Sequence, residues 1–265
     1  MLTELRKVIP SFLKRVYLDD RGVAWSRYLS STHDAMEVIA GQLFPAGTPA
    51  DPAPVVTLTD FDPAAEVKVV ASMLYSHLDL PERQIEDRVR DLTTDERLAV
   101  VRAYVGERAN RRHKPGRALE RPFYRFDVLA DYGAFRDLQR HRMLTIEWQR
   151  LTPHHGYTRP GAVEAAGAAP AFDEAMERSA ALYGDLVAPF PDQASYAVSL
   201  AYKVRFMINL NARAAMHLIE LRTTPQGHPA YRLVGQEMHR LIAEDAGHHA
   251  ITAMLRFVDR SEDDE

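Results

Sequence analysis

The clearest structural signal in the chain is the stretch Phe-Tyr-Arg-Phe-Asp-Val-Leu at residues 123–129. Within it Tyr124, Phe126 and Val128 are apolar and alternate with charged residues. A period of two predicts a half-buried β-strand, because successive side chains of a strand point to opposite faces of the sheet. The protein should therefore contain a sheet with one face against the core.

Helix start signals follow this strand and recur further along the chain. Asp131 can cap a helix over residues 132–141, and Asn211 can cap a helix over residues 212–222. The apolar and β-branched residues 55–59 predict a second strand. Further helices are predicted at residues 33–43, 62–74, 94–106, 170–186, 192–202 and 229–258, the last interrupted near Gly247. A few strands with many helices predict an α+β fold.

The first 54 residues differ from the rest of the chain. Residues 44–54 contain four prolines, which cannot continue a helix or a central strand, so this stretch is interpreted as a linker. The chain is therefore divided into an N-terminal extension with a Pro-rich linker, residues 1–54, and a main domain, residues 55–260.

Composition excludes several classes of function. The 265 residues carry a formal net charge of −4, so no basic excess suggests a nucleic-acid partner. The chain contains 0 cysteines, which excludes disulfides, thiolate metal sites and a cysteine nucleophile. No signal segment opens the sequence, and no apolar run approaches the roughly 18 residues of a membrane span. We expect a cytoplasmic protein without a membrane partner.

Three consecutive cations, Arg140, His141 and Arg142, stand at the end of the helix predicted at residues 132–141. Cations there complement the helix dipole, so a solvated C-terminal cap is one interpretation. Adjacent helical residues point about 100° apart, so at least one of the three should face inward and need an anion. An anion-binding site is therefore the second interpretation, and the local pattern leaves both open.

The predicted helix 212–222 carries polar residues on a largely apolar background. Arg213 and His217 are four residues apart and share a face, and Arg222 ends the helix. Polar groups on a buried helix are costly unless partners compensate them. Either a structural hydrogen-bond network or a ligand site explains them.

A cluster of Glu and His residues near the C-terminus is a weaker candidate site. Glu244 and His248 are four residues apart and could ligate a metal ion. A carboxylate–histidine metal site in a helical bundle needs a matching pair on another helix, which the sequence lacks, so no metal is predicted. The full cluster is Glu237, His239, Glu244, His248 and His249. The chain also lacks a Gly-rich phosphate loop, so arginines and helix ends would have to hold any nucleotide.

These motifs together resemble those of the flavin-dependent thymidylate synthases. The family signature Arg-His-Arg, placed after a strand and a helix, matches residues 140–142. A second family block, Asn-x-Arg followed by a helix ending in Leu-Arg, matches residues 211–213 and 221–222. A third block carries a glutamate that falls on Glu120. The resemblance covers about residues 55–258.

The resemblance implies a central, mostly antiparallel sheet flanked by helices, and a homotetramer that holds FAD between protomers. In this family reduced flavin sends hydride to dUMP, methylenetetrahydrofolate supplies the methyl carbon, and NADPH is the reductant. By resemblance, Arg222 would bind the nucleotide. The residues that would contact or order FAD are Arg140, His141, Arg142, Asn211, Arg213, His217 and Glu120.

The sequence departs from the family pattern on the nucleotide side. The family serine after the signature falls on Arg150, and the arginine two residues later falls on Thr152. Arg150 offers a bidentate fork that could hold a phosphate in their place. The family glutamine before the signature falls on Asp137, which presents only acceptors to a pyrimidine edge when ionised.

Three functional hypotheses follow. The first is reductive methylation of a uracil nucleotide at C5. The second is a flavin- or nucleotide-binding homologue that does not methylate and has a structural or regulatory role, which the changes at Arg150, Thr152 and Asp137 favour. The third is metal-dependent hydrolysis by the C-terminal Glu and His residues, which the chain supports least.

Overall fold

The computed structural model describes residues 1–16, 18, 20–45 and 47–261. It divides into two compact units, Met1–Pro52 and Ala53–Glu265. Residues 17, 19 and 46 of the predicted extension lie outside the described residues.

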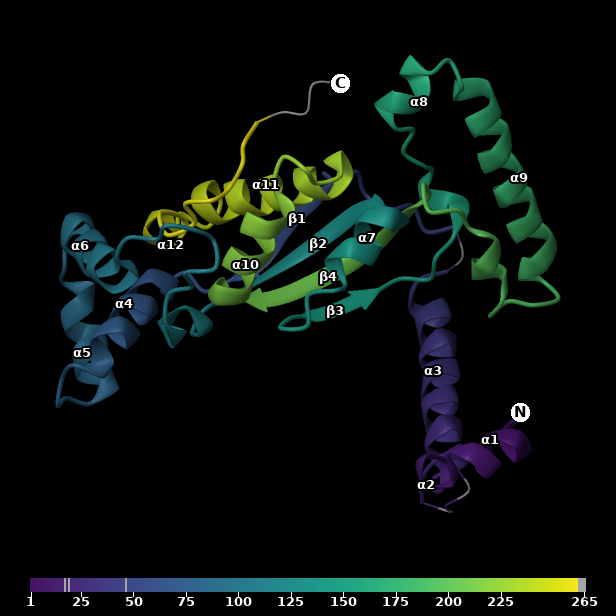
Figure 1. The fold of residues 1–265 in the computed structure, drawn as a ribbon, viewed down its shortest axis with the longest axis horizontal. Coiled ribbons are helices and arrows are strands. Elements are labelled where there is room, and N and C mark those ends of the chain that lie inside the picture. The colour runs from purple at the N-terminus through teal and green to yellow at the C-terminus, as the bar shows by residue number, and fades with distance from the viewer. Residues whose placement is uncertain (17, 19, 46, 262–265) are drawn as a thin grey trace. The chain divides into compact units, whose positions relative to one another are not determined.

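A four-stranded sheet forms the centre of the second unit (Figure 1). The strand order is β1-β2-β4-β3, and every neighbouring pair is antiparallel. This confirms the expected α+β fold with an antiparallel sheet flanked by helices. The strands are β1 Val56–Phe61, β2 Phe123–Asp131, β3 Thr145–Trp148 and β4 Lys203–Asn211.

The alternation of residues in β2 buries one face of the strand, as predicted. Tyr124, Phe126 and Val128 are fully buried, at 0% exposure, on the face that meets the helices. Strand β4 pairs with β2 along its full length and contributes the apolar residues of the same face. These are Val204, Phe206, Ile208 and Leu210.

The prediction of a helix at residues 192–202 is wrong. Residues Ala194–Ala197 form one 3₁₀ turn, η3, and the chain then extends into β4, which the sequence interpretation missed. The carbonyls of Leu200 and Tyr202 accept hydrogen bonds from the backbone N–H groups of Gly133 and Tyr132, at the start of the helix that follows β2. These long-range bonds stabilise an extended chain where local spacing favoured a helix.

Both predicted caps are present. The Asp131 carboxylate accepts from the backbone of Ala134 at 2.7 Å and begins α7, Tyr132–Leu138, which ends three residues earlier than predicted. Asn211 accepts from Ala214 at 2.8 Å and begins α10, Ala212–Arg222, as predicted.

Two other predicted helices have different limits. The last long helix, α11, ends at Glu244, and after Gly247 at φ 69° the chain forms only the short α12, His249–Thr252. Helix α3 begins at Val23 and not near residue 33, and it continues through Ser31 and Thr32, whose hydroxyls cap no helix. They donate to the carbonyls three residues earlier, as hydroxyl groups inside a helix do.

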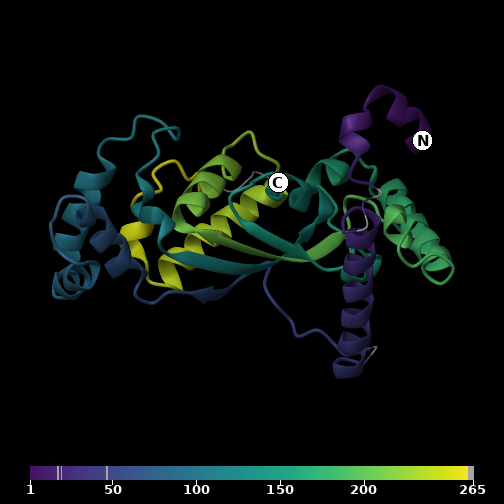
Figure 2. The same cartoon turned by 90° about the horizontal axis from the view of Figure 1, so that it is seen from below.

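The remaining elements surround the sheet or belong to the first unit. Helices α7, α10 and α11 pack on the sheet, while α4, α5 and α6 gather at one end and α9 lies beyond the other (Figures 1 and 2). No helix among the described residues is long and apolar enough to cross a membrane. Their bounds are α1 Leu2–Val8, α2 Pro10–Leu13, α3 Val23–Leu43, α4 Ala65–Tyr75, α5 Glu82–Arg90, α6 Thr94–Val105, η1 Arg117–Glu120, η2 Pro153–His155, α8 Gly161–Ala165, α9 Ala169–Val187 and α11 Pro229–Glu244.

Candidate functional site

Strand pairing brings the two sequence motifs together. Thr145 of β3 pairs with Asn209 of β4, which sets the segment 140–144 beside the end of β4. Asn211, the last residue of β4, then begins α10 at the same edge. Segments about 70 residues apart in the sequence therefore face each other across one cleft.

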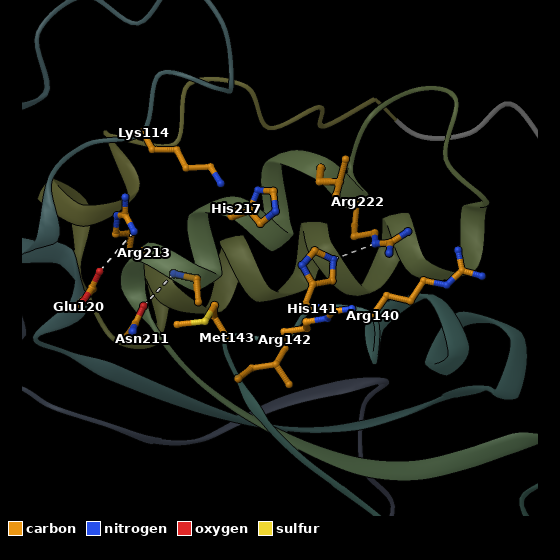
Figure 3. Close-up of a pocket in the computed structure, with 13 residues that line it drawn as sticks. Lys114, Glu120, Arg140, His141, Arg142, Met143, Asn211, Arg213, His217 and Arg222 are labelled. Atoms are coloured by element: carbon orange, nitrogen blue, oxygen red, sulfur yellow. Dashed lines mark hydrogen bonds and ion pairs between the residues drawn. The ribbon is translucent and has the colours of Figure 1, made fainter. Parts of the chain in front are cut away.

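The cleft has a volume of about 390 Å³ and is strongly cationic (Figure 3). Of its thirteen lining residues, all of them described, five are Lys or Arg and one, Glu120, is acidic. An excess of guanidinium and ammonium groups in a concave site favours phosphate or carboxylate ligands. The lining residues are Lys114, Glu120, Arg140, His141, Arg142, Met143, Leu144, Asn211, Arg213, Ala214, His217, Leu221 and Arg222.

Arg222 and His141 form one side of the cleft. The Arg222 Nε–H donates to Nε2 of His141 at 3.1 Å, so that ring nitrogen is unprotonated and the neutral ring carries its hydrogen on Nδ1. Burial, together with the charges of Arg222 and His217, lowers the pKa of His141 to about 4. His141 is therefore a neutral hydrogen-bond donor and acceptor near neutral pH.

Asp137 holds the other edge of the Arg222 guanidinium. Nη1 of Arg222 lies 3.4 Å from the Asp137 carboxylate, and Nη2 donates to the Asp137 backbone carbonyl. Asp137 also lies 3.5 Å from Nη1 of Arg140, whose side chain is 75% exposed. Arg222 thus already has protein partners, while within the part of the chain that the structure describes the exposed Arg140 side chain has one long contact, to the Asp137 carboxylate.

His217 lies between the two sides of the cleft. Its ring meets that of His141 edge-on, with 5.5 Å between centroids. Burial lowers its pKa, and nearby Lys114, Arg111 and Arg222 add to the shift. A neutral imidazole in a cationic cleft can accept or donate hydrogen bonds without repelling the arginines.

Glu120 and Arg213 form the opposite side (Figure 3). Arg213 donates through Nε to the Pro115 carbonyl at 3.1 Å and through Nη1 to Glu120 at 3.3 Å. Hydrogen bonds from Arg117 lower the pKa of Glu120, and the charge of Arg213 contributes. Glu120 therefore stays ionised and orients Arg213, and its predicted role in ordering an FAD site stays a prediction.

The predicted site residues do not all meet in this cleft. Arg140, His141, Arg142, Asn211, Arg213, His217, Glu120 and Arg222 line it, and Asp137 contacts it through Arg222. Arg150 lies past the far end of β3, where the backbone of the preceding Gln149 donates to the Arg205 carbonyl. Its predicted phosphate contact stays a prediction.

The sequence interpretation missed the support beneath the cleft. Arg108 forms a bidentate ion pair with Glu220 of α10, with both N–O distances 2.6 Å and side chains 1% and 2% exposed. Arg108 also donates to the carbonyls of His113 and Met254 at 2.6 and 2.7 Å. The pair ties the loop that carries Lys114 to the back of α10. One feature of the sequence could have indicated that Glu220 is buried. It follows the apolar Met216 by four residues, so the two share a face of the helix.

The C-terminal Glu and His residues are used in other ways. Glu237 and Glu244 both pair with Arg240 on the surface of α11. His248 is buried and its Nδ1 lies 2.8 Å from the Tyr124 hydroxyl. Within the described part of the chain, no group of three or more His, Asp or Glu residues is placed to hold a metal ion. These contacts offer nothing in favour of metal-dependent hydrolysis.

Comparison with known proteins identifies the family. A family model described as thymidylate synthase complementing protein matches residues 56–246. The chain belongs to this family. The match confirms the resemblance to the flavin-dependent thymidylate synthases, and the matched range contains every residue of the cleft.

Two of three relatives named UPF0159 match nearly the whole chain. UPF0159 proteins of Chlamydia pneumoniae and Chlamydia muridarum are each 35% identical over 99% of it, and each match covers 49% of the relative. A UPF0159 protein of Thermoplasma acidophilum is 32% identical over 72% of the chain and 38% of the relative. The chain therefore spans about half the length, or less, of these relatives.

Solved structures share the fold. The UMP/dUMP methylase PolB from Streptomyces cacaoi, bound with 5-Br dUMP, aligns with a TM-score of 0.56 and 19% identity over 77% of this chain and 97% of that chain. The same methylase bound with 5-Br UMP gives a TM-score of 0.54 and 18% identity over 77% and 96%. Identity this low supports a shared fold and no more.

Proposed function

We propose that the cleft binds FAD and a uracil nucleotide and that the protein methylates the nucleotide reductively, using methylenetetrahydrofolate and NADPH. The observation that carries the proposal is the convergence of the two family blocks, residues 140–142 and 211–222, on one cationic cleft. Chance similarity of either block alone would not predict that they face each other.

The residues of the cleft suit the phosphates of FAD. Arg140 and Arg142 are exposed at its rim, and Lys114 adds a third cation. Glu120 would not repel the ligand strongly, since Arg117 and Arg213 already pair with it. Bound FAD, once reduced, would supply hydride. The protein's part is to hold the phosphates with arginines and to offer Nδ1–H of neutral His141 as a fixed hydrogen-bond donor.

Arg140→Ala tests FAD binding. A charge-assisted bond to phosphate contributes about 1.5–3 kcal/mol, so the variant should bind FAD at least tenfold more weakly in a fluorescence titration. The fold should be unaffected because the Arg140 side chain is 75% exposed. Arg136→Ala is the matched control, since Arg136 lies on α7, is exposed and does not line the cleft. Equal affinity of both variants and the parent would contradict the assignment.

The contacts of the cleft do not specify which uracil nucleotide the protein prefers. The family description, thymidylate synthase complementing protein, supports a uracil nucleotide as the ligand class, and the fold neighbours are named UMP/dUMP methylase. Calorimetry with dUMP, UMP and dTMP on the FAD-loaded protein measures the preference. If FAD binds and none of the three nucleotides does at millimolar concentration, the methylation proposal is wrong.

One observation favours a second candidate, a flavin- or nucleotide-binding homologue that does not methylate. Arg222, the expected nucleotide ligand, already contacts Asp137 and His141. A phosphate would have to compete with the Asp137 carboxylate for this guanidinium. Formation of dTMP or methylated UMP from labelled methylenetetrahydrofolate decides between the two candidates.

The proposal includes a homotetramer with FAD between protomers, as the resemblance implies. The cleft of one chain, at about 390 Å³, is at the small end for a cofactor site, which fits completion by a second protomer. Light scattering of the flavin-loaded protein should give a multiple of the 30.0 kDa chain mass. A monomer at micromolar concentration would contradict this part.

A further inference from the structure

Helix α3 of the first unit, Val23–Leu43, has an unusual surface. It is 21 residues long, and none of its residues is buried. A helix of this length in water ordinarily covers an apolar stripe with another element, because packing supplies most of its stability. Among the described residues of the first unit, no element covers the apolar stripe of α3.

The stripe follows a heptad pattern. Trp25, Leu29, Met36, Ile39 and Leu43 stand at the core positions, with spacings that alternate between four and three residues once Thr32 is included. This spacing places all six on one face of the helix. The five apolar side chains are between 46% and 68% exposed. They form five turns of contact surface, which we term the α3 stripe.

The opposite face carries the Asp, Glu and Arg residues of the helix, and the flanks are neutral. Arg27, Asp34 and Glu37 lie away from the α3 stripe. The positions that border the stripe carry no Asp, Glu, Lys or Arg. They are Ser26, Tyr28, His33, Ala35, Ala40 and Gln42. Flanking positions usually set repulsion or attraction between paired helices, and here nothing opposes pairing of two identical copies.

The charge on α3 argues against a membrane surface. Membrane-surface helices are rich in Lys and Arg on the polar face. Helix α3 has one arginine against two acids, Asp34 and Glu37, for a net charge of −1 before His33 is counted. Anionic headgroups would not attract this face.

We propose that α3 pairs with α3 of a second copy of this chain through the α3 stripe. Covering a large apolar side chain removes on the order of 100 Å² from water. Five such residues and Thr32 on each of two helices therefore bury on the order of 1,000 Å² or more, the size a specific interface needs. The α3 stripe lies outside residues 56–246, which the family model matches.

Cysteine cross-linking of the full chain tests the pairing, because the natural sequence contains 0 cysteines. Met36→Cys places a thiol on the α3 stripe, and Val38→Cys places one on the other face. Both native side chains are 61% exposed, so the two thiols are matched in accessibility. A short bis-maleimide should link two copies of Met36→Cys at least tenfold more than two copies of Val38→Cys.

A second variant distinguishes a cross-link formed through the paired stripe from one formed by random collision of two copies. Adding Ile39→Asp to Met36→Cys should abolish the product, because it buries a carboxylate in the paired stripe. Equal cross-linking at positions 36 and 38, persistence in the Ile39→Asp background, or no product from Met36→Cys would each overturn the proposal. Co-flotation of the protein with phosphatidylserine vesicles, lost in Ile39→Asp, would instead assign the stripe to a membrane and also overturn it.

Discussion

The buried ion pair between Arg108 and Glu220 gives the sharpest test of what stabilises the cleft. Glu220→Gln keeps the size of the side chain and removes its charge. Both partners are nearly inaccessible, with side chains 1% and 2% exposed, so Arg108 would keep a buried positive charge without a counterion. Breaking a buried pair in this way costs about 3–5 kcal/mol. The free energy of unfolding should fall by that amount.

Thermal and urea unfolding, followed by far-UV circular dichroism, measure this loss. In a domain of this size about 1 kcal/mol shifts Tm by about 2–4 °C, so Glu220→Gln should lower Tm by about 10 °C. Glu237→Gln is the matched control, because Glu237 also pairs with an arginine, Arg240, but on the surface of α11. Exposed pairs contribute little. If the two variants unfold alike, the reasoning about Arg108 is refuted.

The same variant should also weaken FAD binding, because the Arg108 pair positions the loop that carries Lys114. Joint replacement by Arg108→Met and Glu220→Leu should be less destabilising than Glu220→Gln alone, since it leaves no buried charge without a partner. A double variant less stable than the single one would mean that the pair adds net stability beyond charge compensation.

Two further predictions concern the cleft itself. The pKa of His141 is lowered from an ordinary 6.5 to about 4, so the unfolded chain binds the extra proton first as the pH falls, and the free energy of unfolding should decrease between those two values. His141→Gln should flatten this dependence in urea titrations at about pH 7 and pH 5, and an unchanged slope would contradict the assignment. Asp137→Gln should release Nη1 of Arg222 from the carboxylate, while the bonds to His141 and to the backbone carbonyl of residue 137 stay, and should strengthen binding of a uracil nucleotide by about tenfold in calorimetry. Asp245→Asn, an exposed site on the end of α11, is the control. Weaker binding in Asp137→Gln would show that the carboxylate itself contacts the ligand.

Local patterns were sufficient where the relevant physics is local. The alternation in β2 requires only that one face of the strand be buried, and the caps at Asp131 and Asn211 require only a side-chain oxygen within three residues of a free N–H. The family blocks at residues 140–142 and 211–222 likewise occur at recognisable positions in the linear sequence.

Local patterns failed where distant partners decide the conformation. Residues 192–202 have helical spacing, yet the start of α7 holds the end of this segment extended, and β4 follows as the partner of β2. Strand β3 alternates polar and apolar residues, but with four residues it is the shortest run that predicts a strand, and the sequence interpretation missed it. The hydroxyls of Ser31 and Thr32 are suited to a cap, but α3 continues through them.

The sequence by itself determined the α+β class, the two caps, the family and most residues of the cleft. Only the tertiary structure decided that Arg222 is engaged by Asp137, that Arg150 lies past the far end of β3, and that Arg108 meets Glu220. The partners in that last pair are 112 residues apart. The physical reason is that periodicity and capping depend on neighbours within one or two turns. The partner of a buried charge depends on how the strands register, and that register exists only once the whole sheet has formed.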